Sequence, residues 1–264
     1  MKPQDGSVVV VTGGASGIGA ACARRFAGAG GQSVVVLDRN AAAAQAVAAQ
    51  IGGAALACDI TDAEAVSAAV EEVETGIGPV ATLVACAGIV QDPAPPDRLP
   101  QADFDRVLEV NLRGTYLSCA GFGAAMARRG GGAIIAIASV AGMRSMPLHA
   151  YAPAKAAVIS LVESLAGEWG RAGVRVNAVS PGYTLTPALQ EQIDRGNRDP
   201  ARLRALTALG QLVTPEDVAE AVAFLASPAA RMITGINLPV DAGWLVAGSW
   251  QTFGGVRAAP REAP

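Results

Sequence analysis

Short apolar runs rich in Val, Ile and Ala alternate along the chain with longer segments whose apolar residues recur at helical spacing. Runs of this kind are typical of strands buried on both faces of a parallel sheet. They predict strands near residues 8–12, 33–38, 54–58, 80–86, 132–138, 174–180 and 236–240. The segments between them predict helices near residues 17–29, 41–51, 62–75, 101–129, 150–170 and 215–227. Because strand–helix–strand crossovers are right-handed, this alternation predicts an α/β fold with helices on both faces of a parallel sheet.

The predicted elements follow one another without a linker, so we expect residues 1–264 to form a single domain. A doubly wound arrangement gives the seven predicted strands the order 3-2-1-4-5-6-7 and places a ligand crevice at their carboxyl ends. Residues 183–214 interrupt the alternation but keep apolar residues at roughly helical spacing. We expect them to form two short helices that close over the crevice as a substrate lid, with their arginines facing water. Met143, Met146 and Leu148 are expected to line the entrance.

A glycine-rich turn follows the first predicted strand, where residues 8–19 read V-V-V-V-T-G-G-A-S-G-I-G. In such a turn Gly13 allows the chain to bend sharply, Gly17 allows a pyrophosphate to approach, and Gly19 lets the next helix pack on the strand. The N-terminus of that helix offers unpaired N–H groups to a phosphate. The second predicted strand ends in Asp38, 19 residues after Gly19, where a dinucleotide-binding fold places the acid that binds the adenosine ribose.

A serine, a tyrosine and a lysine occur together in residues 139–155. Tyr151 and Lys155 are four positions apart and therefore share one face of the predicted helix. A unit charge roughly 5 Å away at an effective dielectric near 20 is worth about 3 kcal/mol, or about two pKa units. We therefore expect Lys155 to lower the pKa of the Tyr151 phenol toward the range of general acid–base catalysis. Ser139 would hold a carbonyl oxygen against the tyrosine. A lone Y-x-x-x-K more often decorates a surface helix, but the glycine turn argues against that reading here.

Together these segments resemble the short-chain dehydrogenase/reductase family. The run T-G-G-A-S-G-I-G is similar to the family's T-G-x-x-x-G-x-G cofactor turn. Ser139, Tyr151 and Lys155 match its catalytic residues, and Asn111 in V-N-L-R-G-T-Y matches its fourth. Further similar motifs are C-D-I-T at 58–61, G-V-R-V-N-A-V-S-P-G at 173–182 and I-N-L-P-V-D at 236–241. The resemblance spans nearly the whole chain and implies a Rossmann-type fold that binds NAD across its strand ends.

The resemblance also implies a role for each matching residue. Tyr151 would be the general acid or base, and Ser139 would orient the substrate oxygen. Lys155 would hold the nicotinamide ribose, and Asn111 would hold a water that links Lys155 to solvent. Asp59 and Ile60 would flank the adenine, and residues 181–186 the nicotinamide carboxamide. The cofactor-binding residues implied in this way are Gly13, Ser16, Gly17, Ile18, Gly19, Asp38, Arg39, Asp59, Ile60, Cys86, Ala87, Gly88, Tyr151, Lys155, Pro181, Gly182, Thr184 and Thr186.

Some positions depart from the family pattern. Residues 85–88 read A-C-A-G where the family has N-N-A-G, so a backbone contact survives there but asparagine side-chain bonds do not. Ser139 and Tyr151 are one residue closer than in the family. Pro153 is tolerable only if its helix begins just before the tyrosine, since proline suits a first turn. His149, the only histidine, is expected to be a loop imidazole rather than a substrate contact, and no G-x-S-x-G surrounds a serine that it could serve in a hydrolase.

Composition excludes several other classes of protein. A net charge of −3 and a pI near 5.3 argue against a nucleic-acid surface. No apolar run approaches the roughly 20 residues that span a membrane, and the first residues lack the apolar core of a signal peptide. The four cysteines are scattered, with no C-x-x-C, which argues against a zinc site and a disulfide framework. We expect a cytoplasmic protein that binds no metal.

These observations predict an NAD-dependent oxidoreductase acting on a secondary alcohol or its ketone, with a polyol or a cyclic alcohol as candidate substrates. Asp38 would repel the 2′-phosphate of NADP and outweigh the neighbouring Arg39. One alternative is an NADP-dependent 3-oxoacyl-carrier-protein reductase, which would want a basic residue where the turn has Ser16. Another is a non-catalytic dinucleotide-sensing protein, which would be expected to have lost the tyrosine or the lysine.

The C-terminal tail, residues 241–264, carries Trp244, Trp250 and Phe253, which are costly to leave in water. The resembling family commonly forms tetramers with two-fold symmetry. We therefore expect a homotetramer whose tail packs against a neighbouring subunit, with a tail folded onto its own subunit as the alternative. Residues 257–264 are expected to fray.

Overall fold

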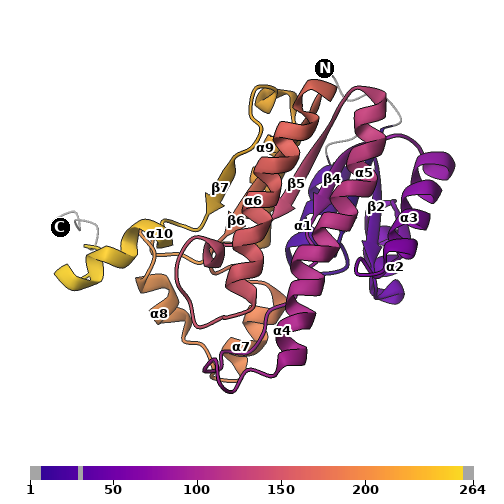
Figure 1. Cartoon of the computed structure of the whole chain (residues 1–264). Helices are drawn as coiled ribbons and strands as arrows, with labels where there is room; N and C mark the ends of the chain where they lie inside the picture. The colour runs from indigo at the N-terminus through magenta and orange to yellow at the C-terminus, as the bar shows by residue number, and fades with distance from the viewer. Residues whose placement is uncertain (1–6, 29–31, 258–264) are drawn as a thin grey trace.

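The computed structural model describes residues 7–28 and 32–257. Its centre is a seven-stranded sheet in the order β3-β2-β1-β4-β5-β6-β7, in which every neighbouring pair is parallel (Figure 1). The predicted fold class and strand order are confirmed. The strands are β1 (Val8–Thr12), β2 (Ser33–Asp38), β3 (Ala54–Ala57), β4 (Val80–Ala85), β5 (Gly132–Ile137), β6 (Val174–Pro181) and β7 (Asn237–Val240).

Helices cover both faces of this sheet. Side chains of α3, α5 and α6 form one core cluster with the strands, and side chains of α1, α2 and α9 form a second. The helices are α1 (Gly17–Gly28), α2 (Ala41–Ile51), α3 (Ala63–Glu72), α4 (Gln101–Leu108), α5 (Thr115–Arg129), α6 (Tyr151–Trp169), α7 (Pro187–Asp194), α8 (Pro200–Ala205), α9 (Pro215–Ala226) and α10 (Trp244–Ala247). None of the helices in the described part of the chain is long and apolar enough to cross a bilayer.

Strand β1 lies at the centre of the sheet and shows why its sequence lacks a polar position. Val8 and Val10 belong to one core cluster, whereas Val9 and Val11 belong to the other, and all four are fully buried. Successive side chains of a strand point to opposite faces, so a strand covered on both sides is apolar throughout. Each such valine contributes roughly 1.5–3 kcal/mol of burial free energy.

The helix predicted over residues 101–129 is present over that range, but its middle is π-helical rather than α-helical. Helix α4 gives way to a π-helical segment, Glu109–Gly114, before α5 begins. Asn111 lies in this segment and its Nδ2 donates to the main-chain oxygen of Val107, at 2.9 Å. Side-chain bonds to main-chain carbonyls compete with the helical hydrogen-bond ladder. Single π turns of this kind often occur at functional sites.

Four unpaired cysteines are distributed over the two faces of the sheet. Cys58 and Cys119 belong to the cluster with α3, α5 and α6, and Cys22 belongs to the cluster with α1, α2 and α9. Cys86 is half-buried at the end of β4. Burial raises the pKa of the Cys58 thiol to about 11 and that of Cys119 to about 12.

Two short helices, α7 and α8, occupy the segment that interrupts the strand–helix alternation. Each begins with a proline at a first-turn position, where its missing N–H costs nothing. The hydroxyl of Thr186 caps α7 and the carboxylate of Asp199 caps α8.

The first turn of the tail contacts residues 183–214 of the same chain. The rings of Trp244 and Tyr183 meet edge to face with centroids 6.1 Å apart. The Leu209 N–H also donates to the Ala242 carbonyl, at 3.0 Å. Beyond α10 the chain extends away from the body of the subunit (Figure 1), and Phe253 is 88% exposed there. Of the residues expected to fray, 258–264 lie outside the described residues.

Candidate active site

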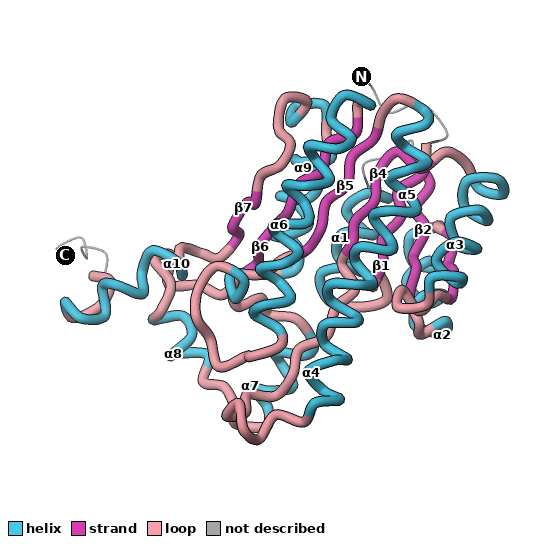
Figure 2. Tube along the Cα trace, in the orientation of Figure 1, coloured by secondary structure: helices cyan, strands magenta, loops and turns pink. Residues whose placement is uncertain are grey.

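The predicted site residues gather at the carboxyl ends of the strands. The registers that join β1 to β2 and β4, and β4 to β5, bring these ends to one edge of the sheet. Loops collect at this edge, with α7 and α8 beyond it (Figure 2). This is where an open parallel sheet binds its ligands.

The glycine turn after β1 is tightly packed. Gly13 has a φ of +64°, and a Cβ at that position would lie 2.6 Å from the Ala87 Cα. A Cβ on Gly19 would lie 2.2 Å from the Gly13 carbonyl oxygen, so α1 begins directly against the turn. Neither position accepts a larger residue. Ser16 is exposed at the tip of the turn, while Gly17 and Ile18 are half-buried.

Thr12 ties this turn to the loop after β4, a role that the sequence analysis missed. Its hydroxyl oxygen accepts hydrogen bonds from the N–H groups of Cys86, at 3.1 Å, and Ala87, at 3.4 Å. A cofactor contact at either residue therefore falls to their carbonyl oxygens or side chains. The T-G-G motif contains Thr12, but no local pattern indicates its distant partner.

Asp38, at the end of β2, is bonded to the glycine turn across the sheet edge. Its Oδ2 accepts from the Ala15 N–H at 3.2 Å, and its Oδ1 accepts from the Asn40 N–H at 3.0 Å. A carboxylate offers roughly four lone-pair sites, so it keeps acceptor capacity for two hydroxyl groups. Arg39 is exposed beside it.

The two residues expected to flank an adenine differ in their surroundings. Asp59 accepts from the N–H and the hydroxyl of Thr61, at 2.9 and 2.8 Å, and these bonds, with Arg106 nearby, hold its pKa below the usual range. The Ile60 side chain is buried in the core, where a Cβ on Gly114 would meet it at 2.6 Å. Only the main chain of Ile60 is left to face a ligand.

The segment after β6 reaches back to the glycine turn. Pro181 and Thr184 are buried, and the Thr184 hydroxyl donates to the Gly182 carbonyl at 3.1 Å. The Thr186 side chain lies 3.4 Å from the position that a Cβ on Gly17 would take. The start of residues 183–214 therefore lies against the turn.

Ser139, Tyr151 and Lys155 converge between β5 and α6. The Lys155 Nζ lies 5.6 Å from the centroid of the Tyr151 ring and donates to the Ile137 carbonyl at 2.7 Å. The Ser139 Oγ accepts from the Ala141 N–H at 3.1 Å, which leaves its own proton free to donate. Helix α6 begins at Tyr151, so Pro153 lies in its first turn as the sequence requires.

The electrostatics of this group differ from the expectation. Burial raises the pKa of Tyr151 above its ordinary value, although a hydrogen bond with Ser139 acts to lower it. The net pKa of this phenol therefore lies above its ordinary value, whereas the sequence predicts a lowered one, because the effect of burial exceeds the effects that lower it. Burial also lowers the pKa of Lys155 to about 8, because desolvation penalises the charged form of either group.

Asn111 completes the group from the π-helical segment. It is fully buried, its Nδ2 donates to the Ile89 carbonyl at 2.8 Å, and its Oδ1 has no hydrogen-bond partner among the described residues. A Cβ on Gly88 would lie 2.7 Å from this oxygen and 3.5 Å from the Lys155 Nζ. Asn111 and Lys155 therefore meet at Gly88. An orphaned buried acceptor, a glycine-rich turn and the open acceptor sites of Asp38 together fit a dinucleotide laid along this edge.

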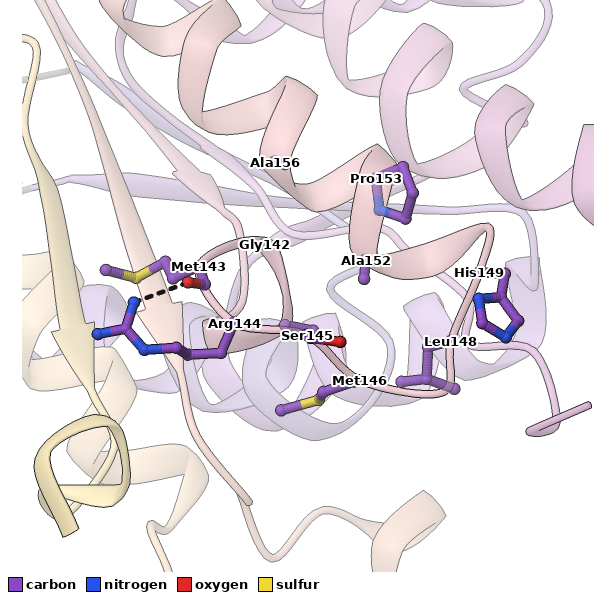
Figure 3. A pocket seen from close by; sticks show the side chains of 11 residues that line it. Gly142, Met143, Arg144, Ser145, Met146, Leu148, His149, Ala152, Pro153 and Ala156 are labelled. Carbon is purple, nitrogen blue, oxygen red and sulfur yellow. Dashed lines mark hydrogen bonds between the residues drawn. The ribbon is translucent and has the colours of Figure 1, made fainter. Parts of the chain in front are cut away.

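A cavity of about 370 Å³ lies beside the group formed by Ser139, Tyr151 and Lys155. Met143, Met146, Leu148 and His149 line it from the loop, opposite Ala152, Pro153 and Ala156 of α6 (Figure 3). None of Ser139, Tyr151 and Lys155 lines it. The residues expected at the entrance thus share one cavity, and the Ser139 and Tyr151 hydroxyls are not part of its lining.

Comparisons with known proteins agree with this geometry. A family model described as enoyl-(acyl carrier protein) reductase matches residues 13–245. D-threitol dehydrogenase of Mycolicibacterium smegmatis is 42% identical, over 92% of this chain and 94% of that protein. Galactitol 2-dehydrogenase (L-tagatose-forming) of Cereibacter sphaeroides is 40% identical, over 92% of this chain and 96% of that protein.

Solved structures give the same fold. A structure named ribose-5-phosphate isomerase from Brucella melitensis 16M is 53% identical, with a TM-score of 0.93 over 96% of this chain and 98% of that one. An oxidoreductase of the short-chain dehydrogenase/reductase family from Burkholderia thailandensis is 38% identical, with a TM-score of 0.86 over 93% of this chain and 95% of that one. The chain belongs to the short-chain dehydrogenase/reductase family and is an oxidoreductase that acts on alcohols.

Proposed function

We propose that this protein is an NAD-dependent dehydrogenase that oxidises a secondary alcohol of a polyol and, in reverse, reduces the corresponding ketone. The observation that carries the proposal is the convergence of Ser139, Tyr151 and Lys155 on the same sheet edge as Asp38. The names of the threitol and galactitol dehydrogenases support a polyol with adjacent hydroxyl groups. A cyclic secondary alcohol is the second substrate class to test.

In the proposed mechanism, Tyr151 exchanges the proton of the substrate hydroxyl. The Ser139 hydroxyl keeps its proton and donates one hydrogen bond, either to the substrate oxygen or to the Tyr151 phenolate. Lys155 has a pKa of about 8 and is mostly protonated at neutral pH, so it supplies a positive charge near the phenol. The nicotinamide, when bound, accepts or donates the hydride.

The raised pKa of Tyr151 gives a direction for the pH dependence. Alcohol oxidation needs the phenol as a base, so we expect its rate to rise toward alkaline pH. Ketone reduction needs the phenol as an acid and should persist to lower pH. Rate profiles in the two directions measure this difference.

The choice of NAD over NADP rests on Asp38. The carboxylate can accept from the ribose hydroxyls and would repel a 2′-phosphate. A 3-oxoacyl-carrier-protein reductase that uses NADP is disfavoured, because the exposed tip of the turn carries the uncharged Ser16. Ribose 5-phosphate isomerisation would need neither Asp38 nor the glycine turn, so that sugar phosphate belongs in the assay as a separate substrate.

The decisive experiment assays the purified protein with NAD against C4 to C6 polyols and cyclic secondary alcohols. Tyr151→Phe should lower turnover by about 10²- to 10⁴-fold while NAD binding persists, because only the transferable proton is lost. Tyr116→Phe, at a 48% exposed tyrosine on α5, is the matched control and should be unaffected. A Tyr151→Phe enzyme that keeps most of its turnover would refute the proposed proton path.

The proposal also includes the setting of the enzyme. We propose a homotetramer in which the exposed tail face, Val246, Trp250 and Phe253, meets a neighbouring subunit. Four unpaired thiols agree with a reducing, cytoplasmic compartment.

A further inference from the structure

Helix α6 begins at the catalytic tyrosine without a capping side chain from its own segment. Ala150, the residue before Tyr151, has no side-chain acceptor to offer the first turn. The Ala152 N–H bonds to the Leu148 carbonyl at 2.9 Å, and Pro153 has no N–H. The N–H groups of Ala150 and Tyr151 therefore need an acceptor from elsewhere in the chain.

Gln91, from the loop after β4, supplies that acceptor. Its Oε1 accepts from the Ala150 N–H at 2.8 Å and from the Tyr151 N–H at 2.9 Å. Only the oxygen of the amide can accept two such bonds, so its orientation is fixed by its partners. Gln91 is only 8% exposed, and its bond with the Ala150 N–H is buried while that with the Tyr151 N–H is partly buried.

The loop that carries Gln91 is bonded to the rest of the site as well. Ile89 lies two residues before Gln91, and its carbonyl oxygen accepts a hydrogen bond from the Asn111 side chain. The same short stretch thus contacts Asn111 through its main chain and Tyr151 through its side chain. A shift of this loop would move two members of the catalytic group relative to each other.

The other half of the Gln91 amide shows that stability alone does not explain this residue. The Nε2 is buried and has no hydrogen-bond partner among the described residues. An unpaired buried donor destabilises the folded state. An acidic cap would avoid that cost, but its negative charge would raise the pKa of the adjacent phenol further.

We propose that Gln91 is a positioning residue, a neutral remote cap that fixes the main chain of Tyr151 against Ser139 and Lys155. The proposal rests on the proposed function, in which Tyr151 exchanges the substrate proton. It assigns Gln91 no contact with the reacting atoms. Its effect should therefore be seen in turnover and in the pH profile, and not in cofactor affinity.

The test compares two variants of Gln91 with a neighbouring control. Gln91→Met keeps the side-chain length but removes the acceptor, and should lower kcat by about 10- to 100-fold, since small misplacements carry costs of that size. The dissociation constant for NAD should stay within about twofold, because a positioning loss at Tyr151 acts on orientation rather than on binding. Hydrogen exchange at Ala150 and Tyr151 should accelerate. Asp92→Asn, at the exposed next residue, should change none of these.

Gln91→Glu keeps the shape and the acceptor but adds a titratable charge. In this variant, hydrogen exchange at the first turn of α6 should remain slow. Its turnover at alkaline pH should approach that of the wild type. The midpoint of its pH–rate profile for alcohol oxidation should move upward. This variant tests the inference even where Gln91→Met does not fold.

The outcomes separate this inference from the proposed function. If Gln91→Met keeps wild-type kcat while Tyr151→Phe is inactive, the role of Gln91 is wrong and the proposed function stands. If Gln91→Glu has the wild-type pH profile, the argument for a neutral cap is wrong. If Tyr151→Phe itself remains active, the proposed function fails first.

Discussion

Replacing Asp38 with asparagine tests cofactor choice most directly. The side chain keeps its size, but its charge and one of its two acceptors are lost. The carboxylate now accepts from Ala15 and Asn40, so the variant can keep only one of those two bonds in its present form. Melting temperature should be measured alongside activity to show that the turn has survived.

The expected change in cofactor preference has two parts, a loss of affinity for NAD and a gain of affinity for NADP. Hydrogen bonds to a charged acceptor contribute about 1.5–3 kcal/mol and neutral ones about 0.5–1.5, so NAD should lose about 1 kcal/mol, or roughly fivefold in affinity. A 2′-phosphate about 4 Å from the carboxylate is repelled by roughly 1 kcal/mol at the dielectric of water and about 4 at an effective dielectric of 20. Relief of that repulsion should favour NADP by roughly 5- to 1,000-fold. Arg39 then becomes available to pair with the phosphate.

The assay is kcat/KM with NAD and with NADP for the wild type, Asp38→Asn and Glu168→Gln. Glu168 is an exposed carboxylate on α6, so its variant controls for loss of a charge elsewhere. The NAD preference of the wild type should narrow or reverse only in Asp38→Asn. A wild type that uses both cofactors equally, or an unchanged ratio in the variant, would refute the reasoning. An equal loss with both cofactors would show that Asp38 supports the turn instead.

Two further predictions concern stability and assembly. Lys155 has a pKa of about 8 in the folded protein against 10.5 for the ordinary group, so folding at neutral pH carries a cost of roughly 3 kcal/mol, partly offset by the bond to Ile137. Lys155→Met should therefore abolish turnover yet raise the melting temperature at neutral pH. Between pH 8 and 10.5 the wild type loses this cost, so the difference in melting temperature between the variant and the wild type should shrink over that range. Trp250→Ser with Phe253→Ser should weaken the proposed tetramer without changing the Trp244 contact, and light scattering that still gives an unchanged tetramer would exclude the tail from the interface.

The sequence predicts those features that depend on neighbours along the chain. The strand positions follow from runs such as Val8–Val11, whose burial on both faces leaves no room for a polar residue. Local spacing along the sequence is enough to identify the glycine turn, Asp38 and the Tyr151–Lys155 pair. These parts of the fold and site could be predicted before any coordinates.

The remaining features depend on contacts between distant segments. Gln91 meets Tyr151 only after the loop beyond β4 folds against α6, and no periodicity indicates it. The π-helical segment at Asn111 changes the helix by a fraction of a turn, which an apolar pattern does not register. The raised pKa of Tyr151 reflects how much water the folded chain excludes, whereas spacing gives only the distance to Lys155. The contact of the tail with residues 183–214 is made by Trp244 and Tyr183, which lie far apart in the sequence, so no local pattern indicates it.

The four cysteines give the molecule a built-in set of kinetic reporters. A thiol reacts with an alkylating reagent as its thiolate, and burial raises the pKa of Cys119 to about 12 and that of Cys22 well above its ordinary value. These two thiols should therefore hardly react with such reagents in the intact protein, and their labelling should follow transient opening. Cys119 and Cys22 lie on opposite faces of the sheet, so mass spectrometry of the labelled peptides can time the loosening of each helical layer separately. Peptide mapping of the labelled protein thus measures the opening rate of each half of the core.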